Sequence, residues 1–179
     1  MDDITNNISE RLSKTSSRII IDQLVNEAIE NHAMIDSLFN LINDPNDQIA
    51  MRAAWTLSHI ALKEKTLIIP YQEKIVDKIY EYRNESVNRS LLKTLSILPL
   101  HESMDGTFYD HCLERLTLKE TSIANRAYLI EIILKYIRVY PELAQEVTSL
   151  LEILKNDDSP GVRGKINYAT KTINSLKAL

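Results

Sequence analysis

The stretch FNLINDPNDQIAMRA, residues 39–53, decides the fold of this chain. Apolar residues close one segment, the polar turn 43–47 follows, and apolar residues then return at helical spacing up to Arg52-Ala53. Asp and Asn side chains accept hydrogen bonds from the free amides of a first helical turn. The stretch therefore predicts two helices joined by a short turn, with the cap of the second helix at Asp47.

Key positions of this stretch recur along the chain at a step of 37 residues. A capping residue type stands five positions before each recurring arginine, and apolar residues stand ten and thirteen positions before it. Agreement at several positions in four copies predicts a structural repeat. The four arginines and the small residues that follow them are Arg52-Ala53, Arg89-Ser90, Arg126-Ala127 and Arg163-Gly164.

Each repeat is expected to contain a first helix, A, and a second helix, B. Because helices lie about 8–10 Å apart where they cross, the small residue after each arginine is expected at the closest approach of A and B. In the leading pair of helices, Arg18 stands 34 residues before Arg52 as its expected counterpart. We expect A helices near 32–43, 71–83, 107–118 and 141–155, B helices near 48–63, 85–98, 122–139 and 159–177, and a leading pair at 3–13 and 16–31.

Two segments, residues 38–47 continuing to Ile60 and residues 157–163, resemble HEAT repeats, which have an Asp-Pro-type turn followed by Val-Arg and small and apolar residues. The resemblance covers about residues 32–177, although the Val-Arg pair itself stands only at Val162-Arg163. It implies an all-α fold, a right-handed αα-superhelix of about four to five helical pairs with the B helices on the concave side. Armadillo and other helical solenoids remain alternatives. The expected organisation is one domain over 1–179, with capping helices at 1–31 and repeats at about 32–66, 67–103, 104–140 and 141–177.

The composition argues against several classes of function. Three separated glycines exclude a Gly-rich phosphate loop, and a single cysteine, Cys112, excludes an internal disulfide or a multi-thiolate metal site. The four histidines show no metal-ligand spacing, so we expect no metal, no cofactor and no catalytic residues. The N-terminus has no signal-peptide pattern and no apolar run reaches the roughly 20 residues of a membrane span, which predicts a cytoplasmic protein without membrane contact.

Charge separates the two kinds of helix. The expected B spans hold eleven basic and two acidic residues, whereas the A spans hold five basic and nine acidic residues in a chain of net charge -4. A basic concave face would attract an anionic partner. The resemblance implies a protein-binding or scaffolding role without enzymatic activity, and the charge favours a protein or acidic peptide as partner. The candidate contacts are Arg52, Arg89, Lys93, Arg126, Arg163, Tyr136 and His59.

Several of these residues also have a structural interpretation. The arginine column is expected either to bond carbonyls and Asp44-type residues inside the stack or to bind a partner as well. Tyr136 and Tyr140 either form a patch for a partner or a second copy of the chain, or pack on the neighbouring repeat. Trp55 occupies a position held by Leu92, Leu129 and Ile166 in other repeats, which favours core packing, and Cys112 is expected as a buried inert thiol.

Two other functions remain as alternatives. HEAT-like repeats also build the bacterial alkylation-repair DNA glycosylases, so nucleic-acid binding is the second hypothesis, although those proteins are strongly basic and this chain is acidic. The third is an enzyme of the adenylosuccinate lyase kind. The signature loop of that superfamily is absent, because the nearest fragment, residues 103–106, lacks its Lys and Asn.

Overall fold

The computed structural model describes residues 2–14, 17–81, 84–157 and 159–177. Within those ranges the chain forms ten α-helices and no strand, which confirms the all-α prediction. The helices are α1 (Asp3–Lys14), α2 (Arg18–Glu30), α3 (Ala33–Leu41), α4 (Asp47–Lys63), α5 (Gln72–Glu81), α6 (Glu85–Ile97), α7 (Gly106–Thr117), α8 (Ile123–Val139), α9 (Ala144–Leu154) and α10 (Pro160–Lys177). Short 3₁₀ turns at Lys65–Leu67, Ile69–Tyr71 and Pro141–Leu143 lead into α5 and α9.

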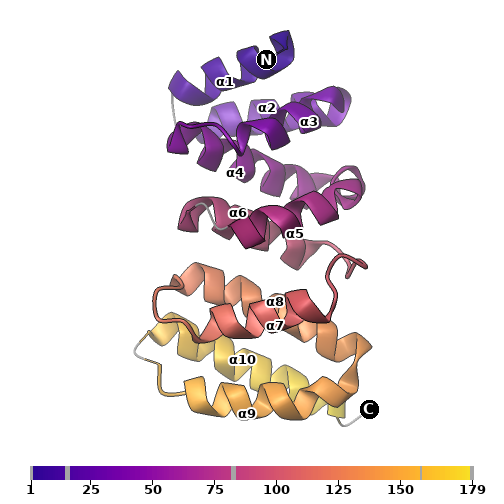
Figure 1. Cartoon of the computed structure of the whole chain (residues 1–179), viewed down its shortest axis with the longest axis vertical. Helices are drawn as coiled ribbons and strands as arrows, with labels where there is room; N and C mark the ends of the chain where they lie inside the picture. Colours follow the sequence, from indigo (N-terminus) through magenta and orange to yellow (C-terminus); the bar gives the residue numbers. More distant parts are fainter. Residues whose placement is uncertain (1, 15–16, 82–83, 158, 178–179) are drawn as a thin grey trace. The chain divides into compact units, whose positions relative to one another are not determined.

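The chain divides into two compact units, Met1–Leu98 and Pro99–Leu179. Unit 1 holds α1 to α6 and unit 2 holds α7 to α10 (Figure 1). The boundary falls in the connection between α6 and α7. Organisation as one domain over 1–179 stays a prediction.

In each unit the helices pack as pairs, and the B helices of successive pairs pack on one another. In unit 1, α2, α4 and α6 form the B layer, with α3 against α4 and α5 against α6. In unit 2, α8 packs on α10, with α7 against α8 and α9 against α10. Fully buried leucines and isoleucines fill these contacts, such as Leu24, Leu57 and Leu91 in unit 1 and Ile133 and Ile173 in unit 2. Each such side chain contributes about 1.5–3 kcal/mol of transfer free energy, so the B layer supplies much of the core.

The helix caps lie one residue away from some expected positions. Asn84 caps α6 as expected, because its side chain accepts a hydrogen bond from the Val87 amide at 2.9 Å. Asn46 rather than Asp47 caps α4, and Ser122 rather than Thr121 caps α8. Asn caps a helix about as well as Asp, and Ser caps it better than Thr. Either residue of the pairs Asn46-Asp47 and Thr121-Ser122 therefore fits the sequence pattern. The expected cap Asp158 lies outside the described residues.

Two hydrogen bonds between neighbouring pairs of helices span the 37-residue step. Lys63 Nζ donates to Asn26 Oδ1 at 2.8 Å, and Tyr109 Oη donates to Glu146 at 3.0 Å, each across 37 positions. At this step Arg18 corresponds to Trp55 and not to Arg52, so the expected 34-residue counterpart was wrong. The slip of three residues turns a helical position by about 60° around the axis, which moves Arg18 onto another face.

The small residues after the arginines do not all mark a close approach. Ala53 and Ser90 are buried, whereas Ala127 is half-buried. Gly164 is exposed, and a Cβ atom placed there would meet nothing within 4 Å. Gly164, the small residue after the fourth arginine, therefore does not lie at a close approach of two helices as expected.

Candidate functional site

Arg52 ties α4 to the end of α1. The side chain is buried, with 7% of the residue exposed, and its Nη1 donates to the carbonyl of Leu12 and, at 3.4 Å, to that of Ser13. Nη2 donates to Gln48 Oε1 at 3.3 Å. The bonds to Leu12 and Ser13 satisfy carbonyl groups at the end of α1 that have no hydrogen-bond partner inside their own helix. Arg52 is therefore part of the packed interior of unit 1.

Arg126 has the same kind of position in unit 2. It is 8% exposed, and its guanidinium donates to Asp157 Oδ2 at 2.5 Å and to the Leu118 carbonyl at 2.9 Å. Arg163 is exposed, but it also bonds this turn, because Nη1 donates to the Asp157 carbonyl at 2.7 Å. The bonds of these arginines, like those of Arg52, match the structural interpretation of the arginine column.

Arg89 and Lys93 differ from the rest of the candidates. Arg89 is exposed and Lys93 is half-buried on α6. Within the described part of the chain neither side chain forms a hydrogen bond or an ion pair. Burial lowers the pKa of Lys93, and the positive charges of Arg18 and Arg89 lower it further. Lys93 therefore lies in a positive local potential, and within the described residues neither its side chain nor that of Arg89 has a carboxylate partner.

Further basic groups of unit 1 surround Lys93. We call Arg18 on α2, His59 and Lys63 on α4, and Arg89 and Lys93 on α6 the basic B-helix face. These three helices pack directly on one another, α2 on α4 and α4 on α6. Arg18 is partly neutralised by Asp22 at 2.9 Å, and Lys63 bonds the neutral amide of Asn26.

His59 lies at the centre of the basic B-helix face. Burial lowers its pKa, the charges of Lys93, Arg18 and Lys63 lower it further, and Asp22 alone opposes them. The Trp55 ring meets the imidazole edge-on, with ring centroids 5.8 Å apart. Trp55 is half-buried rather than part of the core, so its expected core packing is only partly realised.

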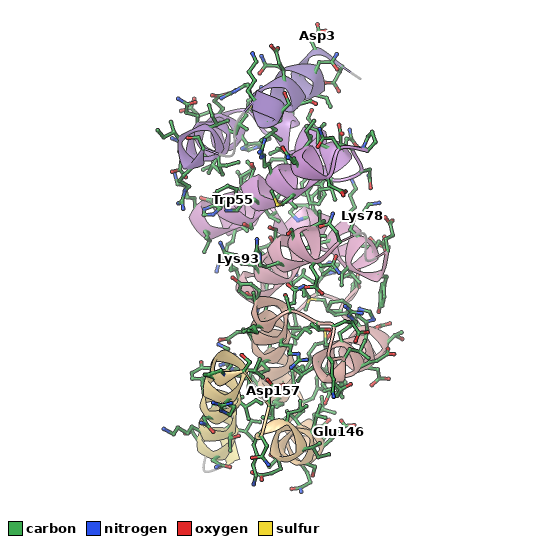
Figure 2. The ribbon with its side chains drawn as sticks, turned by 90° about the vertical axis from the view of Figure 1, so that its left-hand side faces the viewer. Asp3, Trp55, Lys78, Lys93, Glu146 and Asp157 are labelled. Atoms are coloured by element: carbon green, nitrogen blue, oxygen red, sulfur yellow. The ribbon has the colours of Figure 1, made fainter. Side chains whose placement is uncertain are left out.

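The opposite side of unit 1 carries paired lysines. Lys78 on α5 forms an ion pair with Glu81 at 2.7 Å, and Lys74 lies 3.8 Å from Asp36. Figure 2 shows Trp55 and Lys93 along one edge of unit 1 and Lys78 along the other. Lys74 and Lys78 on this side thus each have a carboxylate partner, in contrast to Arg89 and Lys93 on the B helix α6.

Unit 2 has its own basic residues on the B helices, and some of them are paired. Lys165 on α10 forms an ion pair with Glu131 on α8 and lies 4.6 Å from the centroid of the Tyr168 ring. Lys135 is half-buried, and burial together with Arg138 lowers its pKa to about 8.

Tyr136 is not available as a surface contact. It is 3% exposed, its hydroxyl donates to the Met104 carbonyl at 2.8 Å, and its ring lies 5.1 Å from that of Tyr109. Ile130 and Ile133 are buried as well, whereas Tyr140 is exposed. The expectation of a partner patch at Tyr136 is corrected: the hydroxyl finds its acceptor inside unit 2, which makes burial of the ring favourable.

Groups with catalytic or metal-binding potential are dispersed. Cys112 is fully buried, and burial raises the pKa of its thiol, as expected for an inert cysteine. No group of three or more His, Cys, Asp or Glu side chains in the described ranges is placed to hold a metal ion. Among the helices of those ranges, none combines the length and apolarity that crossing a bilayer requires.

Helical pairs that recur at a fixed step and pack through their B helices define an α-helical repeat protein. A family model described as HEAT repeat domain matches residues 8–173, and the chain belongs to this family. No curated protein matches the sequence significantly. HEAT repeats generally mediate protein interactions, and the family is generally non-enzymatic.

Proposed function

We propose that this protein is a non-enzymatic interaction module that binds an acidic segment of another protein through the basic B-helix face. The observation that carries the proposal is the placement of Arg89 and Lys93. Both stand beside further cations of unit 1, and neither has a carboxylate partner among the described residues.

An acidic partner supplies the charge that the face lacks. Like charges close together repel one another, and a carboxylate placed between Lys93 and Arg89 would relieve this repulsion. Complementary charge also speeds association and disfavours basic competitors. The half-buried Trp55 ring meets the imidazole of His59 on this face, so an acidic segment with an apolar residue suits the surface better than a purely charged one.

The contacts are fewer than the sequence suggested. Arg52 and Arg126 already use their guanidinium groups inside the units, and Arg163 bonds the turn at Asp157. We therefore propose Arg89, Lys93 and His59 as partner contacts and add Arg18 and Lys63. The role as a scaffold and the cytoplasmic location belong to the same proposal.

Charge reversal tests the surface. Arg89→Glu/Lys93→Glu is compared with Lys74→Glu/Lys78→Glu, which makes the same charge change on the A side of unit 1. Each protein is immobilised and exposed to lysate of the native cell with and without nuclease treatment, and the retained proteins are quantified. Circular dichroism and Trp55 fluorescence first establish that both variants are folded.

The proposal expects proteins that are retained by the wild type and by the A-side variant but reduced at least about tenfold by the B-side variant. Equal retention by all three proteins would refute the surface. Retention that disappears only after nuclease treatment would favour nucleic acid as the partner, with a steep dependence on salt.

A further inference from the structure

We propose that binding of an acidic segment to the basic B-helix face is coupled to uptake of a proton by His59, so that the face holds its partner more tightly as the pH falls below neutrality. This inference rests on the proposed function, since it concerns the regulation of that site. It adds a condition, the pH, under which the surface is occupied.

His59 lies near charged groups on three helices. The imidazole stands on α4, the middle helix of the B layer, between α2 and α6. Charged groups act on it from all three helices: Arg18 and Asp22 from α2, Lys63 from α4 and Lys93 from α6. Three of these four groups are cations, so in the free protein a charged imidazolium adds a further positive charge to a surface that is already positive.

The imidazole of His59 makes few contacts that would fix its protonation state. Its ring lies beside the Trp55 ring, with the ring centroids 5.8 Å apart, and within the described residues no hydrogen bond fixes either ring nitrogen. The ring is half-buried, so part of it remains accessible to a partner. Burial and Lys93 keep the pKa of His59 below its ordinary value in the free protein.

The direction of the coupling follows from linkage. Carboxylates of a bound segment add negative charge near Lys93 and His59 and thereby raise the pKa of the imidazole. Binding then takes up a proton in the interval between the free and the bound pKa, and the affinity rises as the pH falls through that interval. A rise of one unit in the pKa corresponds to at most about a tenfold gain in affinity.

The first part of the test measures the free protein. The pKa of the His59 ring is determined by proton NMR in the wild type and in Lys93→Gln. We expect a value below that of a free histidine in the wild type and a higher value in the variant, because a neighbouring cation is removed. Equal values in the two proteins would overturn the inference.

The second part uses a synthetic poly-aspartate peptide as the probe, because its carboxylates stay ionised down to about pH 5. Binding is measured at low salt at pH 7.5 and pH 5.5 for the wild type, His59→Gln and His32→Gln. His32 is exposed at the start of α3 and serves as the matched control. We expect the wild type and His32→Gln to bind about three- to tenfold more tightly at the lower pH, and His59→Gln to lose this gain.

The outcomes separate the two proposals. If the probe binds the wild type but His59→Gln keeps the full pH dependence, the coupling is refuted and the surface stands. If the wild type binds the probe no better than Arg89→Glu/Lys93→Glu at either pH, the basic B-helix face itself is refuted and the coupling with it.

Discussion

The guanidinium of Arg126 and the carboxylate of Asp157 lie 2.5 Å apart and join α8 to the turn that precedes α10. The side chains are 9% and 17% exposed, so water screens the pair only weakly. The same carboxylate accepts the Ser159 amide at 2.8 Å, and the Leu118 carbonyl accepts from the same arginine. One ion pair thus holds two turns of unit 2 in register.

Arg126→Ala is expected to destabilise unit 2 by about 2–4 kcal/mol, because it leaves Asp157 without its cation in a largely buried site. Urea unfolding followed by circular dichroism measures the loss. Trp55 is the chain's single tryptophan and lies in unit 1, so its fluorescence shows whether unit 1 unfolds independently. Removal of the exposed pair Lys155–Glu152 by Lys155→Ala is the control, with an expected change below about 0.5 kcal/mol. Equal effects of the two substitutions would contradict the role of Arg126.

Gly164→Ala is expected to stabilise the protein by about 0.5–1 kcal/mol. The residue lies inside α10, and a Cβ atom there meets nothing within 4 Å, so only the helix propensity changes. Gly161→Ala is the matched comparison, because its Cβ would stand 3.1 Å from Ile123 Cγ2 and reduce the gain. Thermal melting compares the two, and a destabilised Gly164→Ala would show that this position is crowded after all.

Cys112 is expected to react with Ellman's reagent only when unit 2 opens. The thiol has no exposed surface, and its burial raises the pKa, so the reactive thiolate is scarce in the native state. The reaction should be far slower in buffer than in denaturing urea, and Arg126→Ala should accelerate it because opening becomes easier. Labelling in buffer at the rate of a free thiol would contradict the position of α7.

Lys135 is expected to make stability rise with pH above about 8. Burial and Arg138 lower its pKa to about 8 in the folded protein, whereas an unfolded lysine keeps its proton to about 10.4. Between these values the unfolded state binds more protons, so a higher pH favours the folded state. The side chain is only half-buried, and solvent screening limits the effect to about 1 kcal/mol.

Comparison with Lys135→Met isolates this contribution from other groups that titrate at alkaline pH. We expect the variant to be the more stable protein at pH 7.5 and its advantage to shrink by pH 10. Parallel stability curves in urea at the two pH values would show that Lys135 is not desolvated.

The positions of the helices follow from local signals that the sequence contains. Polar caps such as Asn84, and the spacing of apolar residues between caps, act over only a few residues and can be read directly from the sequence. The expected B helices 48–63 and 122–139 therefore differ from α4 and α8 by one residue at most. The small-residue pattern was less informative, because glycine at 164 satisfies it without a close contact.

The hydrogen-bond partners of the four arginines depend on which groups lie beside each of them in the fold. Arg52 meets the end of α1 and Arg126 meets Asp157, whereas Arg89 meets neither a carbonyl nor a carboxylate in the described chain. Identical residues at identical register therefore end in different environments, which periodicity alone does not distinguish. The electrostatic interaction of Arg18 with Lys93 was missed as well, because it joins residues of α2 and α6 that are far apart in the sequence.

The hydrogen bonds that Lys63 donates to Asn26 and Tyr109 donates to Glu146 depend on a fixed number of residues between the helices they join. Loss or gain of a single residue within a B helix would rotate everything beyond it by about 100° and break this alignment. Duplication of a whole 37-residue segment would keep the phase of the helices beyond it. We therefore expect the fold to tolerate gain or loss of a complete module better than a single-residue insertion inside a B helix.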